Sequence, residues 1–481
     1  MSIFLNGLNL LIIYFISYQF NVILVKQYYS ISRFLKVILS FYKYFIVIVP
    51  IQILTILIKS DILYLISNLL ISIIVVILID KNKIKVSRRS LLQIILSMII
   101  LFLLFYLFEF FCSFSIFLLV ITTTIAFLIL LPFEEIIKKY YLNKAKIKLK
   151  SFKNMKIIGI TGSFGKTSLK YYLKTALEKD FKIAYSPSNV NTLMGITKYI
   201  NNSLEESDFL ILELGIDKKN QMDKFKKLLS LDYAFVTSIG NMHLATFKNI
   251  DNLLKEKLKI SLMLKKEGKL FINDDSQYLN KIEGNNIIKF SKKNVNVKSF
   301  DIEGMKIIDN KKIYNFPIHQ SFFASYLDGI IKFFNELSLD KSKIFYQSNC
   351  FVDFDRRNKV FKKENGYLID NSYNANLKGI EESLKLLKTL DGESYIILGG
   401  IIEQGKNYKV ENSKLKEKLI DENVIFIGNK NHPLIENHQF KKLYITKSVN
   451  EAYKLIREIN PNNVLLLCKG DDVYLRWIWK K

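Results

Sequence analysis

The segment that most constrains the fold is residues 162–167, GSFGKT, which lies between two regular-looking runs. The isoleucine-rich run 156–161 precedes it and has the character of a strand, and the run 168–177 that follows has the character of a helix. A strand, a glycine turn and a helix N-terminus direct backbone N–H groups and a positive dipole at one anion. The segment therefore predicts an α/β unit that binds a phosphate group.

Two side chains of this loop have the chemistry of a nucleotide site. Lys166 has the reach to contact terminal phosphates, and the Thr167 hydroxyl suits the accompanying Mg²⁺. The general Walker pattern has glycine where this chain has Ile160, and that departure narrows the candidate families. We expect ATP and Mg²⁺ as cofactors, with the nucleotide also contacted by Gly162, Ser163, Gly165 and Ser168.

Length, charge and cysteine spacing limit the number of domains and the kinds of partner and site that we expect. The 481 residues allow about three domains at roughly 150 residues each. The net charge of +26 comes mostly from lysines scattered among isoleucine and asparagine, with no compact basic motif, so we expect no nucleic-acid partner. The cysteines are far apart and lack CxxC spacing, which argues against a zinc site and a disulfide framework; they are Cys112, Cys350 and Cys468.

Residues 1–132 are dominated by apolar side chains and predict a transmembrane region. Basic residues concentrate in alternate connecting segments, so the positive-inside rule places the N-terminus outside and the chain after Pro132 in the cytoplasm. The basic segment 133–155 is then either a helix against membrane lipid or a solvated linker. This predicts a multi-pass protein of the inner (cytoplasmic) membrane, with four spans as the alternative to about five, at 8–25, 37–58, 62–79, 91–108 and 113–131.

Polar residues follow two further strand-like runs of the soluble part. Residues 209–215 read as a buried strand that contains Glu213, and residues 233–239 read as another that is followed by His243. The carboxyl ends of parallel strands meet at one edge of an α/β sheet, where ligands gather. We therefore expect Glu213 and His243 beside Lys166 and Thr167, as parts of a metal–nucleotide site.

In their order along the chain, these motifs resemble the Mur ligase family, the ATP-dependent amino-acid ligases of peptidoglycan synthesis. The resemblance covers about residues 156–481, with Phe164 as a departure in the phosphate loop, and is nearest to the MurF branch, which adds D-alanyl-D-alanine. Residues 186–191, with Asn189 and Asn191, resemble the substrate-facing loop of that branch. The implied fold is a helical membrane module (1–132), a basic juxtamembrane linker (133–155), a P-loop central α/β domain (156–340) and a Rossmann-like C-terminal domain (341–481).

The resemblance implies two Mg²⁺ ions. Glu213 matches the family's Mg²⁺-binding acid, and the segment from His243 to Lys257 is similar to the family's histidine and its downstream lysine. In the family that lysine is carbamylated and becomes a ligand of the second Mg²⁺. Lys255 and Lys259 are competitors, but the spacing from His243 favours Lys257.

Further matches lie near the nucleotide and in the last third of the chain. Asn273 lies in a segment that resembles one beside the nucleotide, and His319 fits the start of the helix that closes the central domain. Arg357 aligns with the arginine that reaches ATP phosphate. Residues 370–376, DNSYNAN, are similar to the MurF-branch motif DDxYNANP, so either Asp370 or Asn371 serves the ribose. The residues implied to face substrate are Tyr373, Asn374, Asn376, Glu403 and Lys469.

The implied reaction joins a carboxylate to an amine through an acyl phosphate. Soluble family members hold the UDP-sugar with an N-terminal domain, and only residues 133–155 precede the first strand here. Three alternatives follow: a MurF-type ligase that acts on UDP-MurNAc-tripeptide and D-alanyl-D-alanine; an amide ligase with a lipid-linked or poly-γ-glutamate-like acceptor; and a non-catalytic ATP-binding membrane module. The expected partners are these small-molecule substrates, membrane lipid and other cell-wall synthesis proteins.

Overall fold

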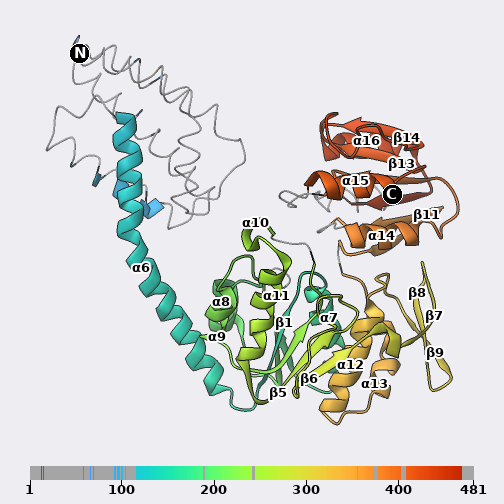
Figure 1. Cartoon of the computed structure of the whole chain (residues 1–481), viewed down its shortest axis with the longest axis horizontal. Helices are drawn as coiled ribbons and strands as arrows, with labels where there is room; N and C mark the ends of the chain where they lie inside the picture. Colours follow the sequence, from blue (N-terminus) through green and yellow to red (C-terminus); the bar gives the residue numbers. More distant parts are fainter. Residues whose placement is uncertain are drawn as a thin grey trace. The chain divides into compact units, whose positions relative to one another are not determined.

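The computed structural model describes residues 115–187, 190–240, 244–354, 356–363, 365–372, 377–401 and 408–467, and isolated positions between 12 and 103. The chain divides into two compact units, residues 1–140 and residues 141–481. Figure 1 colours the elements along the sequence.

The long helix α6, Ser115–Ser151, passes through Pro132 (Figure 1). The first three predicted spans lie almost entirely outside the described residues, and the fourth, 91–108, is described only in part, where its residues are helical. The fifth, 113–131, overlaps the start of α6, whose continuation is rich in charge and holds the ion pair of Glu135 with Lys138 at 2.8 Å.

The predicted membrane location is wrong on this structure. Among the residues given above, none of the helices is long and apolar enough to cross a bilayer. A membrane span needs about 20 consecutive, predominantly apolar residues. Residues 115–131 are the apolar first part of one helix of 37 residues, which continues into a lysine-rich half.

The first sheet of the second unit is parallel throughout and has β1, Lys156–Thr161, near its middle. Its central strands β1 and β3 are nearly continuous apolar runs because helices cover both faces. The strand order β2-β3-β1-β4-β5-β6 places the ends of β1, β3 and β4 side by side. The other strands are β2 (Ile183–Tyr185), β3 (Phe209–Glu213), β4 (Leu231–Val236), β5 (Leu264–Asn273) and β6 (Ile287–Phe290).

Alternate side chains of β1 pack in two different hydrophobic cores, one on each face of the sheet. Ile157 packs in the core that α8, α9 and α11 cover, whereas Ile158 and Ile160 pack in the core that α7 and α12 cover. This alternation is the two-residue period of a strand. The helices are α7 (Lys166–Leu177), α8 (Leu193–Ser203), α9 (Gln221–Lys226), α10 (Leu244–Phe247), α11 (Ile250–Leu258), α12 (Phe323–Glu336) and α13 (Ser342–Tyr346).

A small antiparallel sheet of three strands precedes α12 along the chain (yellow in Figure 1). Its strands pair in chain order, as consecutive antiparallel strands with short turns do. They are β7 (Asn296–Asp301), β8 (Gly304–Asp309) and β9 (Lys312–Phe316).

The last third of the chain forms a second α/β layer (orange to red in Figure 1). The strand order is β10-β11-β15-β12-β13-β14, and only β10 is antiparallel to its neighbour. The predicted α/β architecture with parallel sheets is confirmed. The elements are β10 (Lys359–Lys363), β11 (Gly366–Asp370), α14 (Leu377–Leu387), β12 (Ser394–Leu398), α15 (Tyr408–Lys418), β13 (Asn423–Ile427), β14 (Lys442–Thr446), α16 (Val449–Ile459) and β15 (Asn463–Leu466).

Candidate active site

The phosphate-loop segment joins β1 to α7 and needs glycine at two positions. Gly162 and Gly165 have φ angles of 150° and 75°. A Cβ atom at Gly162 would lie 1.9 Å from the Thr237 hydroxyl oxygen, and one at Gly165 would lie 1.8 Å from the Tyr326 hydroxyl oxygen. The loop therefore packs against the residue that follows β4 and against α12, and its backbone path excludes larger residues at these two positions.

Lys166 opens α7 and folds back over the loop. Its Nζ donates to the carbonyl oxygens of Gly162 at 2.9 Å and of Ser163 at 3.4 Å. Burial lowers the pKa of Lys166, and Glu213 opposes that shift. The ammonium group thus lies within the loop, at the position from which it can meet a bound phosphate.

Thr167 and Glu213 meet at the adjoining ends of α7 and β3. The Thr167 hydroxyl donates to Glu213 Oε2 at 2.7 Å, and both residues are buried. Arg357, from the C-terminal third of the chain, donates through Nη2 to the Thr167 oxygen at 3.1 Å. Asn191 Nδ2 donates to Glu213 Oε1 at 3.4 Å. Four residues singled out from the sequence therefore converge beside the phosphate loop.

The donor set of this cluster suits Mg²⁺. A hydroxyl and a carboxylate oxygen are the hard ligands that Mg²⁺ takes from protein, with water and phosphate oxygens completing its octahedron. Thr167 and Glu213 supply such a pair. Across the described ranges there is no group of three or more His, Cys, Asp or Glu residues that would form an all-protein metal cage.

Lys257 lies on α11 and is buried against the same loop. Its Nζ donates to the Gly162 carbonyl oxygen at 2.9 Å. Burial lowers the pKa of Lys257 well below its usual value, and the charge of Lys166 lowers it further. Of the three lysines weighed from the sequence, Lys255 is exposed and Lys259 pairs with Asp223, so Lys257 alone faces the loop.

Lys170 is a site residue that the sequence analysis missed. Its Nζ lies 3.7 Å from Glu213 Oε2 and donates to the Ser186 carbonyl oxygen at 2.8 Å. Burial lowers the pKa of Lys170 to about 8, with Glu213 opposing the shift. The available signal was its position on α7 three residues after Thr167, which places both side chains on one face of the helix.

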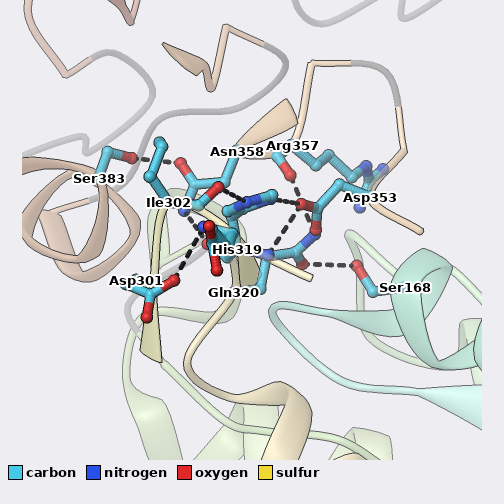
Figure 2. Close-up of polar contacts among 10 residues, drawn as sticks. Ser168, Asp301, Ile302, His319, Gln320, Asp353, Arg357, Asn358 and Ser383 are labelled. Carbon is cyan, nitrogen blue, oxygen red and sulfur yellow. Dashed lines mark hydrogen bonds and ion pairs between the residues drawn. The ribbon is translucent and has the colours of Figure 1, made fainter. Parts of the chain in front are cut away.

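His319 precedes α12 and lies in a buried polar network (Figure 2). Its Nδ1 is 2.6 Å from Asp353 Oδ2 and its Nε2 is 2.7 Å from the Ile302 carbonyl oxygen. The Ile302 carbonyl can only accept, so Nε2 donates to it, whereas the role of Nδ1 follows the protonation of the pair with Asp353. Burial raises the pKa of Asp353, and its hydrogen bonds from His319 and Gln320 oppose that shift. Burial alone would lower the pKa of His319, but the Asp353 hydrogen bond raises it.

Three other predicted nucleotide residues lie at strand ends. Asn273 ends β5 and accepts from the Asp275 backbone at 3.0 Å. Asp370 ends β11 and accepts from the Ser372 backbone at 3.1 Å. Asn371 donates to the Ser383 hydroxyl on α14 at 2.8 Å.

Seven predicted site residues lie outside the residues that the structure describes, so their positions are untested. They are His243, Asn189, Tyr373, Asn374, Asn376, Glu403 and Lys469.

A cavity of about 690 Å³ lies between the start of α12 and the segment that leads into β7. Its volume is in the range of small-molecule sites. Ala324 of α12 and Ser321 just before it line this cavity, together with Phe300, Met305 and residues 292–297.

Fold and site together define a P-loop α/β protein with a separate C-terminal α/β layer. Residues 160–339 match the family described as the Mur ligase middle domain. The match spans the phosphate loop, Glu213 and Lys257.

Two relatives extend the similarity beyond that domain. The UDP-N-acetylmuramoyl-tripeptide--D-alanyl-D-alanine ligase of Rickettsia prowazekii is 26% identical over 341 residues, which are 66% of this chain and 75% of that enzyme. The enzyme of the same name from Buchnera aphidicola is 24% identical over 340 residues, 66% of this chain and 73% of its own.

Solved structures show the same fold. The MurF ligase of Thermotoga maritima in complex with ADP superimposes with a TM-score of 0.62 at 19% identity, covering 71% of this chain and 82% of that one. MurF of Acinetobacter baumannii gives a TM-score of 0.62 at 18% identity, covering 72% and 81%. The Mur ligase fold implied by the sequence motifs is confirmed by these superpositions.

Proposed function

We propose that this protein is an ATP-dependent amide ligase that adds D-alanyl-D-alanine to UDP-MurNAc-tripeptide. The observation that carries the proposal is the contact of Thr167 with both Glu213 and Arg357 beside the phosphate loop. The similarity to the two named ligases supports the same reaction. The ligase class predicted from the sequence motifs agrees with both relatives.

The chemistry follows from the difficulty of joining a carboxylate to an amine at neutral pH. A carboxylate oxygen of the acceptor attacks the γ-phosphorus of ATP, the bond to the ADP oxygen breaks, and an acyl phosphate forms. The amine then attacks the acyl carbon, loses a proton, and inorganic phosphate leaves. Two anions meet in the first step, so neutralising charge is the main task of the site.

The positively charged side chains beside the phosphate loop neutralise this charge. Lys166 contacts the terminal phosphates from within the loop, and Arg357 reaches them from beside Thr167. Thr167 and Glu213 would hold a Mg²⁺ ion, which supplies further neutralisation of phosphate charge when bound. Because Arg357 belongs to the C-terminal third and the loop to the middle domain, the site needs both parts of the chain.

Lys257 is proposed to carry a carbamate. Only a neutral amine reacts with carbon dioxide, and burial lowers the pKa of Lys257 well below its usual value. The carbamate would provide oxygens in place of the ammonium that now faces the Gly162 carbonyl. With His243 it would hold a second Mg²⁺, as the family resemblance implies.

The domain limits and the remaining contacts belong to the same proposal. We assign residues 156–340 to the ATP-binding domain and residues 341–481 to the C-terminal domain. Asn191 would face the acceptor, since its amide reaches Glu213. Asp370 is favoured over Asn371 for the ribose, because the Asn371 amide is already bound to Ser383 and to the Gly379 carbonyl.

A second candidate is an amide ligase with a different acceptor. The chain matches 75% of the Rickettsia prowazekii enzyme, so a quarter of that enzyme has no counterpart in the alignment. Such a ligase would keep the ATP chemistry and change only the molecule whose carboxylate is activated.

Phosphate release separates these candidates. We expect release from ATP with UDP-MurNAc-tripeptide and D-alanyl-D-alanine together, and much less with single amino acids. Lys166→Ala should abolish it, whereas Lys179→Ala, an exposed lysine just beyond α7, should not. Release with another carboxylate but none with the tripeptide would favour the second candidate, and an active Lys166→Ala would refute the site.

A further inference from the structure

Gln320 is a buried amide that joins three segments of the chain (Figure 2). Its Nε2 donates to Asp353 Oδ1 and to the Arg357 carbonyl oxygen, each at 2.9 Å. Its Oε1 accepts from the Ser168 hydroxyl on α7 at 3.1 Å. One side chain therefore touches the phosphate-loop helix and the segment that carries Arg357.

The orientation of the amide is determined by its neighbours. The Arg357 carbonyl and the Asp353 carboxylate only accept hydrogen bonds, so the NH₂ group must face them. The oxygen then faces Ser168, whose hydroxyl is free to rotate and donate. All three contacts are satisfied in this arrangement alone.

Together with the hydrogen bond between Arg357 and Thr167, these contacts form a closed chain of residues at the candidate active site. Ser168 adjoins Thr167 on α7, and Thr167 accepts from the Arg357 guanidinium at 3.1 Å. Gln320 links Ser168 to the backbone of Arg357 itself. The same amide thus holds the backbone of Arg357 and the residue next to Thr167, whose hydroxyl Arg357 meets.

The backbone around Arg357 requires such support. The flanking residues Arg356 and Asn358 have φ angles of 64° and 56°, in the left-handed region that residues with a Cβ seldom adopt. Such conformations persist when surrounding contacts hold them. Gln320 holds the Arg357 carbonyl, and Asn358 Nδ2 donates to the His319 carbonyl at 3.1 Å.

We propose that Gln320 is a positioning residue that places Arg357 on the phosphate loop by gripping its carbonyl and Ser168 together. The inference rests on the proposed function in one respect, that Arg357 contacts bound nucleotide. It assigns a role in nucleotide binding to a side chain that does not itself touch the phosphate loop.

A double-mutant cycle tests this role in the full-length protein, with MgADP as the probe and calorimetry as the readout. Gln320→Leu should weaken MgADP binding about tenfold when Arg357 is present. In an Arg357→Ala background the same change should alter binding less than twofold, because the residue it positions is gone. Gln320→Glu keeps the size and loses both donors, so it should behave as Gln320→Leu does.

Gln347→Leu is the matched control, since Gln347 is also a buried glutamine and follows α13 directly. It should leave MgADP binding unchanged. Equal losses from Gln320→Leu in both backgrounds, or tight binding by Gln320→Glu, would overturn the inference. Because the probe is ADP, this result is independent of which acceptor the enzyme uses: failure of the ligase reaction with tight, coupled ADP binding would refute the proposed function alone.

Discussion

Replacing Gly165 with alanine tests the geometry of the phosphate loop most sharply. Gly165 has a φ of 75°, and its missing Cβ would lie 1.8 Å from the hydroxyl oxygen and 2.8 Å from Cζ of Tyr326. Tyr326 is 2% exposed and packs among the side chains of the core under α12, so it has little room to withdraw.

Two costs add in this variant. A left-handed backbone costs alanine about 1–2 kcal/mol relative to glycine. Forcing a methyl group into a filled core costs about 1–3 kcal/mol more. We therefore expect Gly165→Ala to lower the free energy of unfolding by ~2–5 kcal/mol and to impair nucleotide binding, because the loop must shift to admit the methyl group.

Urea unfolding followed by circular dichroism measures the stability loss, and MgADP calorimetry measures binding. Tyr326→Phe in the Gly165→Ala background should recover part of the loss, since it removes the nearest atom but leaves the backbone strain. Gly399→Ala is the control, because its Cβ would meet only the Ile427 carbonyl oxygen at 3.4 Å. Wild-type stability of Gly165→Ala, or a rescue that is complete, would refute the reasoning.

Three other substitutions give separate predictions. Lys257→Ala should lose ~100-fold in turnover and regain activity with added short carboxylic acids, while Lys255→Ala stays active; full activity of Lys257→Ala without additives eliminates the carbamate. Lys170→Met removes the ammonium group beside buried Glu213 and should lower the free energy of unfolding in urea by ~3 kcal/mol. MgADP should reduce this loss of stability; equal losses with and without MgADP contradict this. The pKa of His319 is raised, so its stabilisation is present below about pH 6.5 and is lost as the pH rises through the folded value. Unfolding free energy should therefore fall more steeply above neutral pH in wild type than in His319→Gln, and parallel profiles would show that the pair with Asp353 does not titrate there.

Short sequence patterns were enough to predict the fold of the middle domain. The strand–GSFGKT–helix order fixes the phosphate loop, and the apolar run that ends in Glu213 fixes a neighbouring strand. Their side chains meet because parallel strands end at one edge of a sheet. Each signal spans only a few residues, and the general rule for parallel sheets brings the two together.

Contacts between distant segments were not predictable in the same way. Gln320 meets Ser168 across 152 positions, and Lys170 meets the Ser186 carbonyl only because β2 returns beside α7. Neither residue belongs to a motif with a required spacing. The membrane prediction rested on hydropathy, which reports the composition of a window of sequence and not the helix that the window forms.

The central claim is that an acceptor carboxylate is activated by phosphoryl transfer from ATP. The most direct measurement uses UDP-MurNAc-tripeptide with both oxygens of its terminal carboxylate labelled as ¹⁸O, with ATP and D-alanyl-D-alanine, and mass analysis of the phosphate released. The acyl phosphate route predicts one ¹⁸O atom in each phosphate, transferred from the carboxylate. Unlabelled phosphate released together with the amide product would contradict the account.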